Sequence, residues 1–249
     1  MKLKNFIRLK LIDLTGYWIF KRNFLPVGVD LVEDLKNKFS IKIQTIFDVG
    51  ANIGQTAISF SHHFPSAKIF SFEPISSTFD KLLFNTQHLK NIISHKLAFS
   101  NKKESVQVKI FDESNSFLNS LNTLSMNESI DAKIEMVHSE TIDSFLQQHS
   151  KIESIDLLKI DTEGYELAVL NGAVESMINE KIKLIYLEVG FFKTDLRHSY
   201  YPGVHQFLEE KNYIFFGLYE ITHHNISNRD SFANALYVHS SYLNEIIFS

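Results

Sequence analysis

The stretch TIFDVGANIGQTAISFSHHFPSAKIFSFEP, residues 45–74, decides the fold. It begins with a short apolar run that ends in the acid Asp48. A turn containing Gly50 and Gly54 follows, and then the apolar spacing of a helix. A second apolar run, residues 69–72, ends in Glu73. This order of strand, glycine turn, helix, strand and acid is typical of a nucleotide-binding βαβ unit.

The glycine spacing indicates which nucleotide the unit binds. A dinucleotide fingerprint places a glycine between the other two, because the pyrophosphate presses against bare backbone. Here Asn52 occupies that place, and Asp48 would repel a pyrophosphate. An acid beside the turn suits a ligand that carries a sulfonium and an ammonium, and Glu73 can bind both ribose hydroxyls. These features predict S-adenosylmethionine (SAM) and disfavour the alternative of an NAD(P)-dependent oxidoreductase.

A second motif, KIDTEGYELAVLNGA at residues 159–173, follows in the same chain. Together with DVGANIG and FEP it resembles the FkbM family of SAM-dependent methyltransferases, over roughly residues 45–238. The resemblance implies an α/β fold of the Rossmann-like class I methyltransferase type. It also implies O-methylation of a hydroxyl on a sugar, glycan, lipid or natural product. A non-catalytic SAM-binding partner subunit stays open as the alternative function.

The remaining apolar pattern fits a seven-stranded, mostly parallel sheet with helices on both faces. Further main strands are expected at 92–97, 154–160, 181–189, 213–219 and 235–239, and shorter ones at 105–111 and 135–139. Helices are expected at 29–39, 75–89, 141–148, 165–179 and 201–211. Residues 112–131 are rich in Ser and Asn and predict a long loop beside the substrate cleft. Ala98 ends the third predicted strand, and the resemblance implies that it lies beside the adenine.

Acids follow several predicted strands at their carboxyl ends, where open α/β sheets bind ligands. The predicted cofactor-binding residues are Asp48, Gly50, Asn52, Gly54, Glu73 and Ala98. The predicted catalytic residues are Asp161, Glu163 and Glu188. Two mechanisms are open for them. Asp161 or Glu163 acts as general base on the acceptor hydroxyl, or Asp161 and Glu188 hold a Mg²⁺ ion that acidifies it.

Composition limits the function classes. Lys and Arg number 25 against 29 Asp and Glu, a net charge of −4, which argues against a nucleic-acid partner and favours a small-molecule or glycan acceptor. The absence of cysteine excludes disulfides and thiolate metal sites and is compatible with a cytoplasmic protein. No apolar run is long enough to cross a bilayer. Nothing in the sequence fixes the oligomeric state.

The first residues form a separate unit of the predicted organisation: a helical leader or lid over 1–40, followed by the methyltransferase domain over 41–249. Residues 1–24 mix basic and apolar side chains without the uninterrupted apolar core of a secretory signal. We expect a helix that packs on the domain or forms a dimer contact. The alternative is a basic amphipathic helix that makes a peripheral membrane contact.

Overall fold

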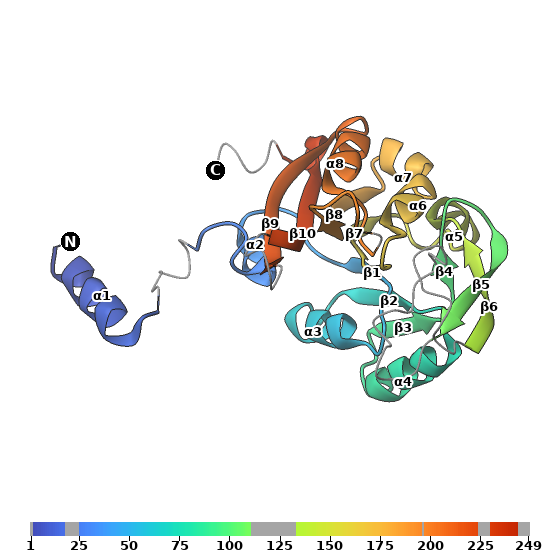
Figure 1. Ribbon diagram of the computed structural model, residues 1–249, viewed down its shortest axis with the longest axis horizontal. Helices are drawn as coiled ribbons and strands as arrows, with labels where there is room; N and C mark the ends of the chain where they lie inside the picture. The colour runs from blue at the N-terminus through green and yellow to red at the C-terminus, as the bar shows by residue number, and fades with distance from the viewer. Residues whose placement is uncertain (1, 18–24, 111–132, 196, 224–229, 244–249) are drawn as a thin grey trace.

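The computed structural model describes residues 2–17, 25–110, 133–195, 197–223 and 230–243. Its centre is a seven-stranded sheet in the order β3-β2-β1-β7-β8-β10-β9 (Figure 1). The strands are β1 Thr45–Val49, β2 Lys68–Phe72, β3 Ile92–His95, β7 Ile155–Ile160, β8 Ile182–Gly190, β9 Tyr213–His223 and β10 Asp230–His239. The first five strands in this order pair in parallel, and β10 runs antiparallel to both of its neighbours. The predicted α/β class is confirmed, and the antiparallel insertion departs from the doubly wound dinucleotide order.

Helices cover both faces of the sheet. They are α2 Leu31–Asn37, α3 Gln55–His63, α4 Ser76–Thr86, α5 Ile142–Gln148, α6 Glu166–Asn171, α7 Val174–Ile178 and α8 Tyr201–Glu209, with a 3₁₀ turn at Ser240–Tyr242. Side chains alternate between the faces of a strand. Phe47 and Leu158 therefore enter the core that includes α5 to α8, while Ile46 and Leu157 enter the core that includes α2 and α3.

The helix predicted over 165–179 is interrupted. It consists of α6 and α7, which separate at Gly172 and Ala173. A β-carbon at Gly172 would lie 2.0 Å from the carbonyl oxygen of Ser100, so the two backbones touch at this point. The close contact explains the glycine, and hydrophobic periodicity alone could not have shown it.

A second, three-stranded sheet holds the two shorter predicted strands. Its order is β4-β6-β5, with β4 Ala98–Phe99, β5 Glu104–Ile110 and β6 Lys133–Glu140. The third strand of the main sheet ends at His95, so Ala98 begins β4 instead of ending β3. Ala98 packs with Ile75, Val108 and Val137 in a small apolar cluster. The predicted loop at 112–131 lies outside the described residues.

The predicted leader divides into two unlike parts. Helix α1, Lys2–Thr15, stands apart from the α/β body (Figure 1), and its Phe6, Leu9 and Leu14 side chains are exposed. Helix α2 instead buries Leu35 in the core, so the body of the domain begins before residue 41. The roles expected for the first helix, packing on the domain or a dimer contact, stay predictions. Among the described helices, none has the length and apolar character needed to cross a membrane.

Candidate active site

The carboxyl ends of the central strands gather the predicted acids at one edge of the sheet. Asp48 on β1 is in register with Ser71 on β2 and with Lys159 on β7. Glu73 and Asp161 follow directly after β2 and β7, and Glu188 lies near the end of β8. Because parallel strands end together, these side chains face a common region, as the sequence predicts.

The glycine turn after β1 is held against the neighbouring strands. The N–H groups of Gly50 and Ala51 both donate to the carbonyl of Phe72, at 3.1 and 3.0 Å. Gly50 has a φ of +77°, and a β-carbon there would lie 1.7 Å from the carbonyl oxygen of Asp161. Only glycine therefore fits this position, where the β1 turn touches the loop after β7. Gly54 completes the turn as the N-cap residue of α3.

Glu73 anchors the same turn through its side chain. One carboxylate oxygen accepts the N–H of Asn52 at 3.2 Å, and the other accepts the N–H of Ile75 at 3.0 Å. Burial raises the pKa of Glu73 to about 7, although the two N–H bonds act in the opposite direction. Each oxygen of an ionised carboxylate keeps a further lone pair, so the group can still accept ligand hydroxyls.

Lys159 links the acids of β1 and β7. Its ammonium lies 3.1 Å from Oδ1 of Asp48 and 3.3 Å from Oδ2 of Asp161, and it donates to the carbonyl of Gly50 at 3.2 Å. Asp48 is fully buried and, within the described part of the chain, neither of its oxygens accepts a well-directed hydrogen bond. Burial raises the pKa of Asp48, and the charge of Lys159 opposes that shift. Lys159 is not among the residues predicted from the sequence, although a charged residue inside the apolar run 155–160 indicates a buried partner.

Asp161 lies on a cavity and not in the group formed by the other two predicted catalytic acids. The cavity has a volume of about 430 Å³, and α2, α3, Tyr186 and Asn234 contribute to its walls. The Asp161 side chain is 40% exposed and pairs with Lys159. The geometry therefore places Asp161 beside the predicted cofactor turn.

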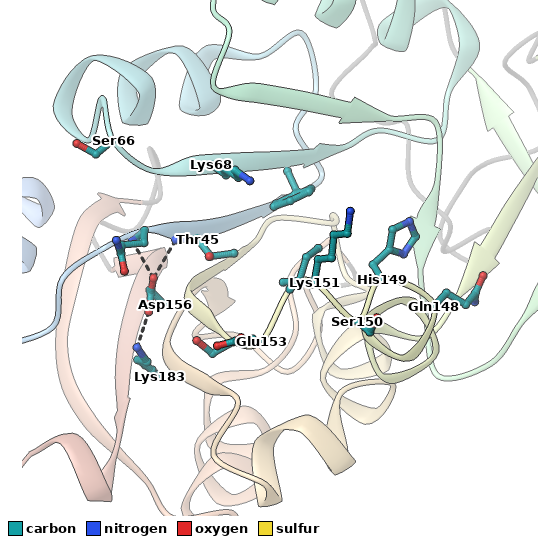
Figure 2. Close-up of a pocket in the computed structure, with 14 residues that line it drawn as sticks. Thr45, Ser66, Lys68, Gln148, His149, Ser150, Lys151, Glu153, Asp156 and Lys183 are labelled. Atoms are coloured by element: carbon teal, nitrogen blue, oxygen red, sulfur yellow. Dashed lines mark hydrogen bonds and ion pairs between the residues drawn. The ribbon is translucent and has the colours of Figure 1, made fainter.

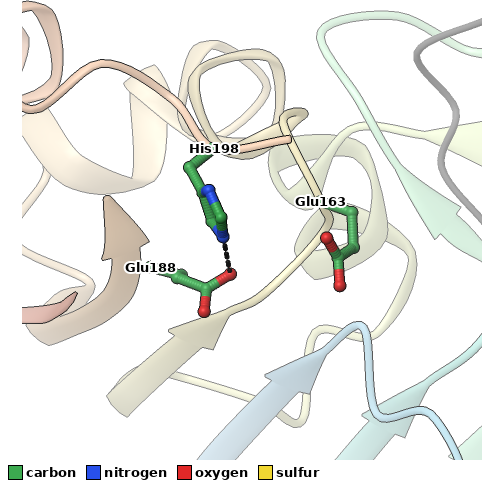
Figure 3. Close-up of side chains that lie close together, drawn as sticks. All are labelled: Glu163, Glu188 and His198. Carbon is green, nitrogen blue, oxygen red and sulfur yellow. Dashed lines mark ion pairs between the residues drawn. The ribbon is translucent and has the colours of Figure 1, made fainter. Parts of the chain in front are cut away.

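Glu163, Glu188 and His198 form a compact group at the same edge (Figure 3). One carboxylate oxygen from each glutamate and one ring nitrogen of His198 all lie within 4.8 Å of one another. Nε2 of His198 lies 3.2 Å from Glu188, and Nδ1 lies 2.7 Å from Asp195. The imidazole also stacks on Phe232 at a centroid distance of 4.4 Å. We call Glu163, Glu188 and His198 the acid–histidine cluster.

Protonation in the acid–histidine cluster follows from burial and charge. Burial, together with repulsion from Asp161 and Glu188, raises the pKa of Glu163 to about 8. Burial acts to lower the pKa of His198, but its contacts with Glu188 and Asp195 outweigh this and raise the pKa to about 9. At neutral pH the cluster therefore holds a charged imidazole beside a glutamate whose pKa is close to the ambient pH.

Glu166 fixes the segments that carry this cluster. It is fully buried, and one oxygen accepts the N–H groups of Thr162 and Gly164 at 3.0 and 3.1 Å. The other oxygen accepts the N–H and hydroxyl of Ser199 at 3.1 and 2.7 Å. Glu166 thus ties the loop containing Glu163 to the segment containing His198.

The structure brings together only part of the predicted site. Glu163 joins Glu188, whereas Asp161 pairs with Lys159 and Ala98 belongs to the small sheet. His198, Glu166 and Asp195 are not among the site residues predicted from the sequence. These three residues become recognisable only when the fold brings the loop after β7, Glu188 and the segments that carry Asp195 and His198 together.

A larger cavity, about 700 Å³, lies at the opposite ends of the strands (Figure 2). Asp156 on its wall accepts the N–H groups of Gln44 and Thr45 at 2.7 and 2.8 Å and pairs with Lys183 at 2.6 Å. Asp156, which lies on β7, thus connects this strand to the start of β1 and to β8. This arrangement indicates a structural role for Asp156.

Sequence comparison identifies relatives over the region that carries the site. A curated relative, Methyltransferase 1 of Beauveria bassiana, is 25% identical over 142 residues, which cover 51% of this chain and 57% of that protein. The hexuronic acid methyltransferase AglP of Haloferax volcanii is 26% identical over 152 residues, 61% of this chain and 59% of that protein. The matched region thus spans less than two thirds of either relative.

Solved structures with a similar arrangement include a SAM-dependent methyltransferase from Aquifex aeolicus, at 12% identity and a TM-score of 0.46, covering 84% of this chain and 89% of that one. Another is fibrillarin from Aeropyrum pernix with bound SAM, at 13% identity and a TM-score of 0.44, covering 79% and 66%. The sequence model of the methyltransferase FkbM domain family matches residues 48–215 of this chain. These residues include the glycine turn, the motif at 159–173 and the acid–histidine cluster. The chain belongs to the FkbM family of methyltransferases.

Proposed function

We propose that this protein transfers the methyl group of SAM to a hydroxyl oxygen of a sugar-like acceptor. The observation that carries the proposal is the position of Glu163. It lies in a loop that touches the predicted cofactor turn, and its raised pKa suits a proton acceptor near neutral pH. An alcohol is a weak nucleophile that needs such a group, whereas a carboxylate acceptor does not.

In the proposed reaction the acceptor oxygen attacks the methyl carbon in line with the sulfonium. The new C–O bond forms as the C–S bond breaks, and the hydroxyl proton passes to Glu163. The products are a methyl ether and S-adenosylhomocysteine. His198 lies between Glu188 and Asp195, where its contacts with both carboxylates offset part of the negative charge of the cluster. Most of the acceleration comes from holding the reactants in this alignment.

A sugar acceptor is supported by one named relative, which acts on a hexuronic acid. Such an acid offers both hydroxyls and a carboxylate to a methyl donor. The acid–histidine cluster favours the hydroxyl, because its acids repel an acceptor carboxylate and only a hydroxyl has a proton to lose.

The test is incubation of the purified protein with SAM and a panel of hexosides and hexuronic acids, followed by mass spectrometry. We expect a methylated product that survives alkaline hydrolysis, formed in equal amount with S-adenosylhomocysteine. An alkali-labile methyl ester would contradict hydroxyl transfer. SAM binding without turnover on any acceptor would favour the alternative of a non-catalytic SAM-binding partner subunit.

A further inference from the structure

We propose that the acid–histidine cluster is a binding site for a divalent transition-metal cation, with Glu163, Glu188 and His198 as its three protein ligands. The three ligand atoms come from the loop after β7, from β8 and from the segment before α8. They lie within 4.8 Å of one another. Ligands bound to one ion at about 2.1 Å each lie within about 4.2 Å of one another, so small side-chain movements close the site.

The surroundings of His198 match those of a metal-binding histidine. Nδ1 of His198 lies 2.7 Å from Asp195, which leaves Nε2 directed at Glu188, 3.2 Å away (Figure 3). Metal-bound histidines have this arrangement, in which a carboxylate on the far nitrogen fixes the ring and strengthens it as a ligand. Stacking on Phe232 fixes the plane of the same ring, and the His198 side chain is 4% exposed. A histidine–glutamate ion pair at a protein surface forms without a second carboxylate on the other ring nitrogen.

Charge at this edge of the sheet also favours a cation. Five carboxylates lie in or next to the cluster: Asp161, Glu163, Glu166, Glu188 and Asp195. The ammonium of Lys159 does not balance them all, because it is shared between Asp48 and Asp161. Carboxylates crowded in this way repel one another in a partly buried site. A bound cation would relieve this repulsion and would replace the proton on Nε2 of His198.

The ligand types indicate which cation binds. Imidazole nitrogen is a common ligand of transition metals, whereas Mg²⁺ prefers oxygen ligands and keeps its waters. Mn²⁺ accepts both nitrogen and carboxylate oxygen, so it is the probe of choice. This set differs from the sequence-based pair of Asp161 and Glu188, because Asp161 pairs with Lys159 instead.

The role of the cation rests on the proposed function. Three protein ligands leave coordination positions for acceptor oxygens, as on a polyol. A hydroxyl bound there becomes more acidic. Its proton can pass to the Glu163 oxygen that does not contact the cation.

The experiment is a titration of the whole, chelator-treated protein with MnCl₂ in the absence of SAM and acceptor. Calorimetry measures the heat of binding, and electron paramagnetic resonance measures the Mn²⁺ that stays free. We expect one saturable site per chain and at least tenfold weaker binding of Mg²⁺. Glu163→Gln and Glu188→Gln should each weaken Mn²⁺ binding at least tenfold. Glu209→Gln is the matched control, because Glu209 pairs with His205 at 3.5 Å but at an exposed position.

Circular dichroism and melting curves show whether each variant is folded. Mn²⁺ should raise the melting temperature of the wild type and of Glu209→Gln but not of Glu163→Gln, which keeps the side-chain shape. No saturable Mn²⁺ site in the wild type, or equal binding in Glu163→Gln, would overturn the inference. Methyl transfer by protein that has no Mn²⁺ site would overturn the metal-site inference and leave the proposed function intact. A Mn²⁺ site in protein that transfers no methyl group would support the metal-site inference and count against the proposed function alone.

Discussion

At both ends of strand β7 a buried acid pairs with a lysine, but the hydrogen bonding of the acid differs between the two ends. At the amino end, Asp156 accepts two backbone N–H groups and pairs with Lys183. At the carboxyl end, Lys159 is shared between Asp48 and Asp161, and Asp48 is buried without a well-directed hydrogen bond in the described chain. A buried charge with full hydrogen bonding stabilises a fold, whereas one left partly unmatched is typical of a functional site. The difference supports a structural role for the amino end of this sheet and the proposed site at its carboxyl end.

The largest expected effect is on catalysis at the carboxyl end. Glu163→Gln keeps the shape of the side chain but removes the proton acceptor, so turnover should fall about a hundredfold or more. SAM affinity should stay within a few-fold, because the role proposed for Glu163 is on the acceptor and not on the cofactor. Production of S-adenosylhomocysteine and calorimetric SAM titration measure the two quantities. An equal loss of both would place Glu163 on the cofactor side.

Asp156→Asn tests the amino end. Loss of the charge weakens the two N–H bonds and leaves Lys183 without its counter-ion, so the free energy of unfolding should fall by about 2 kcal/mol. Turnover per folded molecule should not change. Urea denaturation measures the stability, and a large loss of activity in folded protein would assign Asp156 to function.

Asp48→Asn is the counterpart at the carboxyl end. Burial disfavours the charge of Asp48, and Lys159 keeps Asp161 and the Gly50 carbonyl as partners. Stability should therefore change by less than in Asp156→Asn, within about 1 kcal/mol. SAM affinity should fall about tenfold, since the acid no longer balances the positive charge of the ligand. A variant that unfolds but binds SAM normally would reverse the contrast between the two ends.

The smallest effect concerns pH. Because the pKa of Glu73 is raised to about 7 in the folded protein, its ionised form, which is predicted to accept the ribose hydroxyls, increases as pH rises from 6 to 8. SAM should bind a few-fold more tightly at pH 8 than at pH 6, and Glu73→Gln should remove that part of the dependence. The effect of Glu73 on the stability of the fold has the opposite direction, because the folded state binds the Glu73 proton more tightly than the unfolded state does. The contribution of protonated Glu73 to the free energy of unfolding is present below the unfolded pKa and is lost as pH rises through 7.

The sequence predicted the sheet and the acids that gather at its carboxyl edge, because strands leave strong local patterns. The run around Asp48 and the run before Asp161 mark β1 and β7, and each acid falls where its strand ends. Sequence could not show that Asp161 pairs with Lys159 while Glu163 meets His198, since these choices depend on side-chain directions in the loop after β7. Nor could it reveal Gly172 against Ser100, which is a contact between distant segments.

Calorimetric titration with S-adenosylhomocysteine and, separately, with NAD tests most directly the claim that the carboxyl end of the sheet is a SAM site. We predict that S-adenosylhomocysteine binds more tightly than NAD. SAM binding should weaken in Asp48→Asn and Glu73→Gln and stay unchanged in Asp156→Asn. Equal or tighter binding of NAD, or equal weakening of SAM binding by Asp156→Asn, would contradict the account.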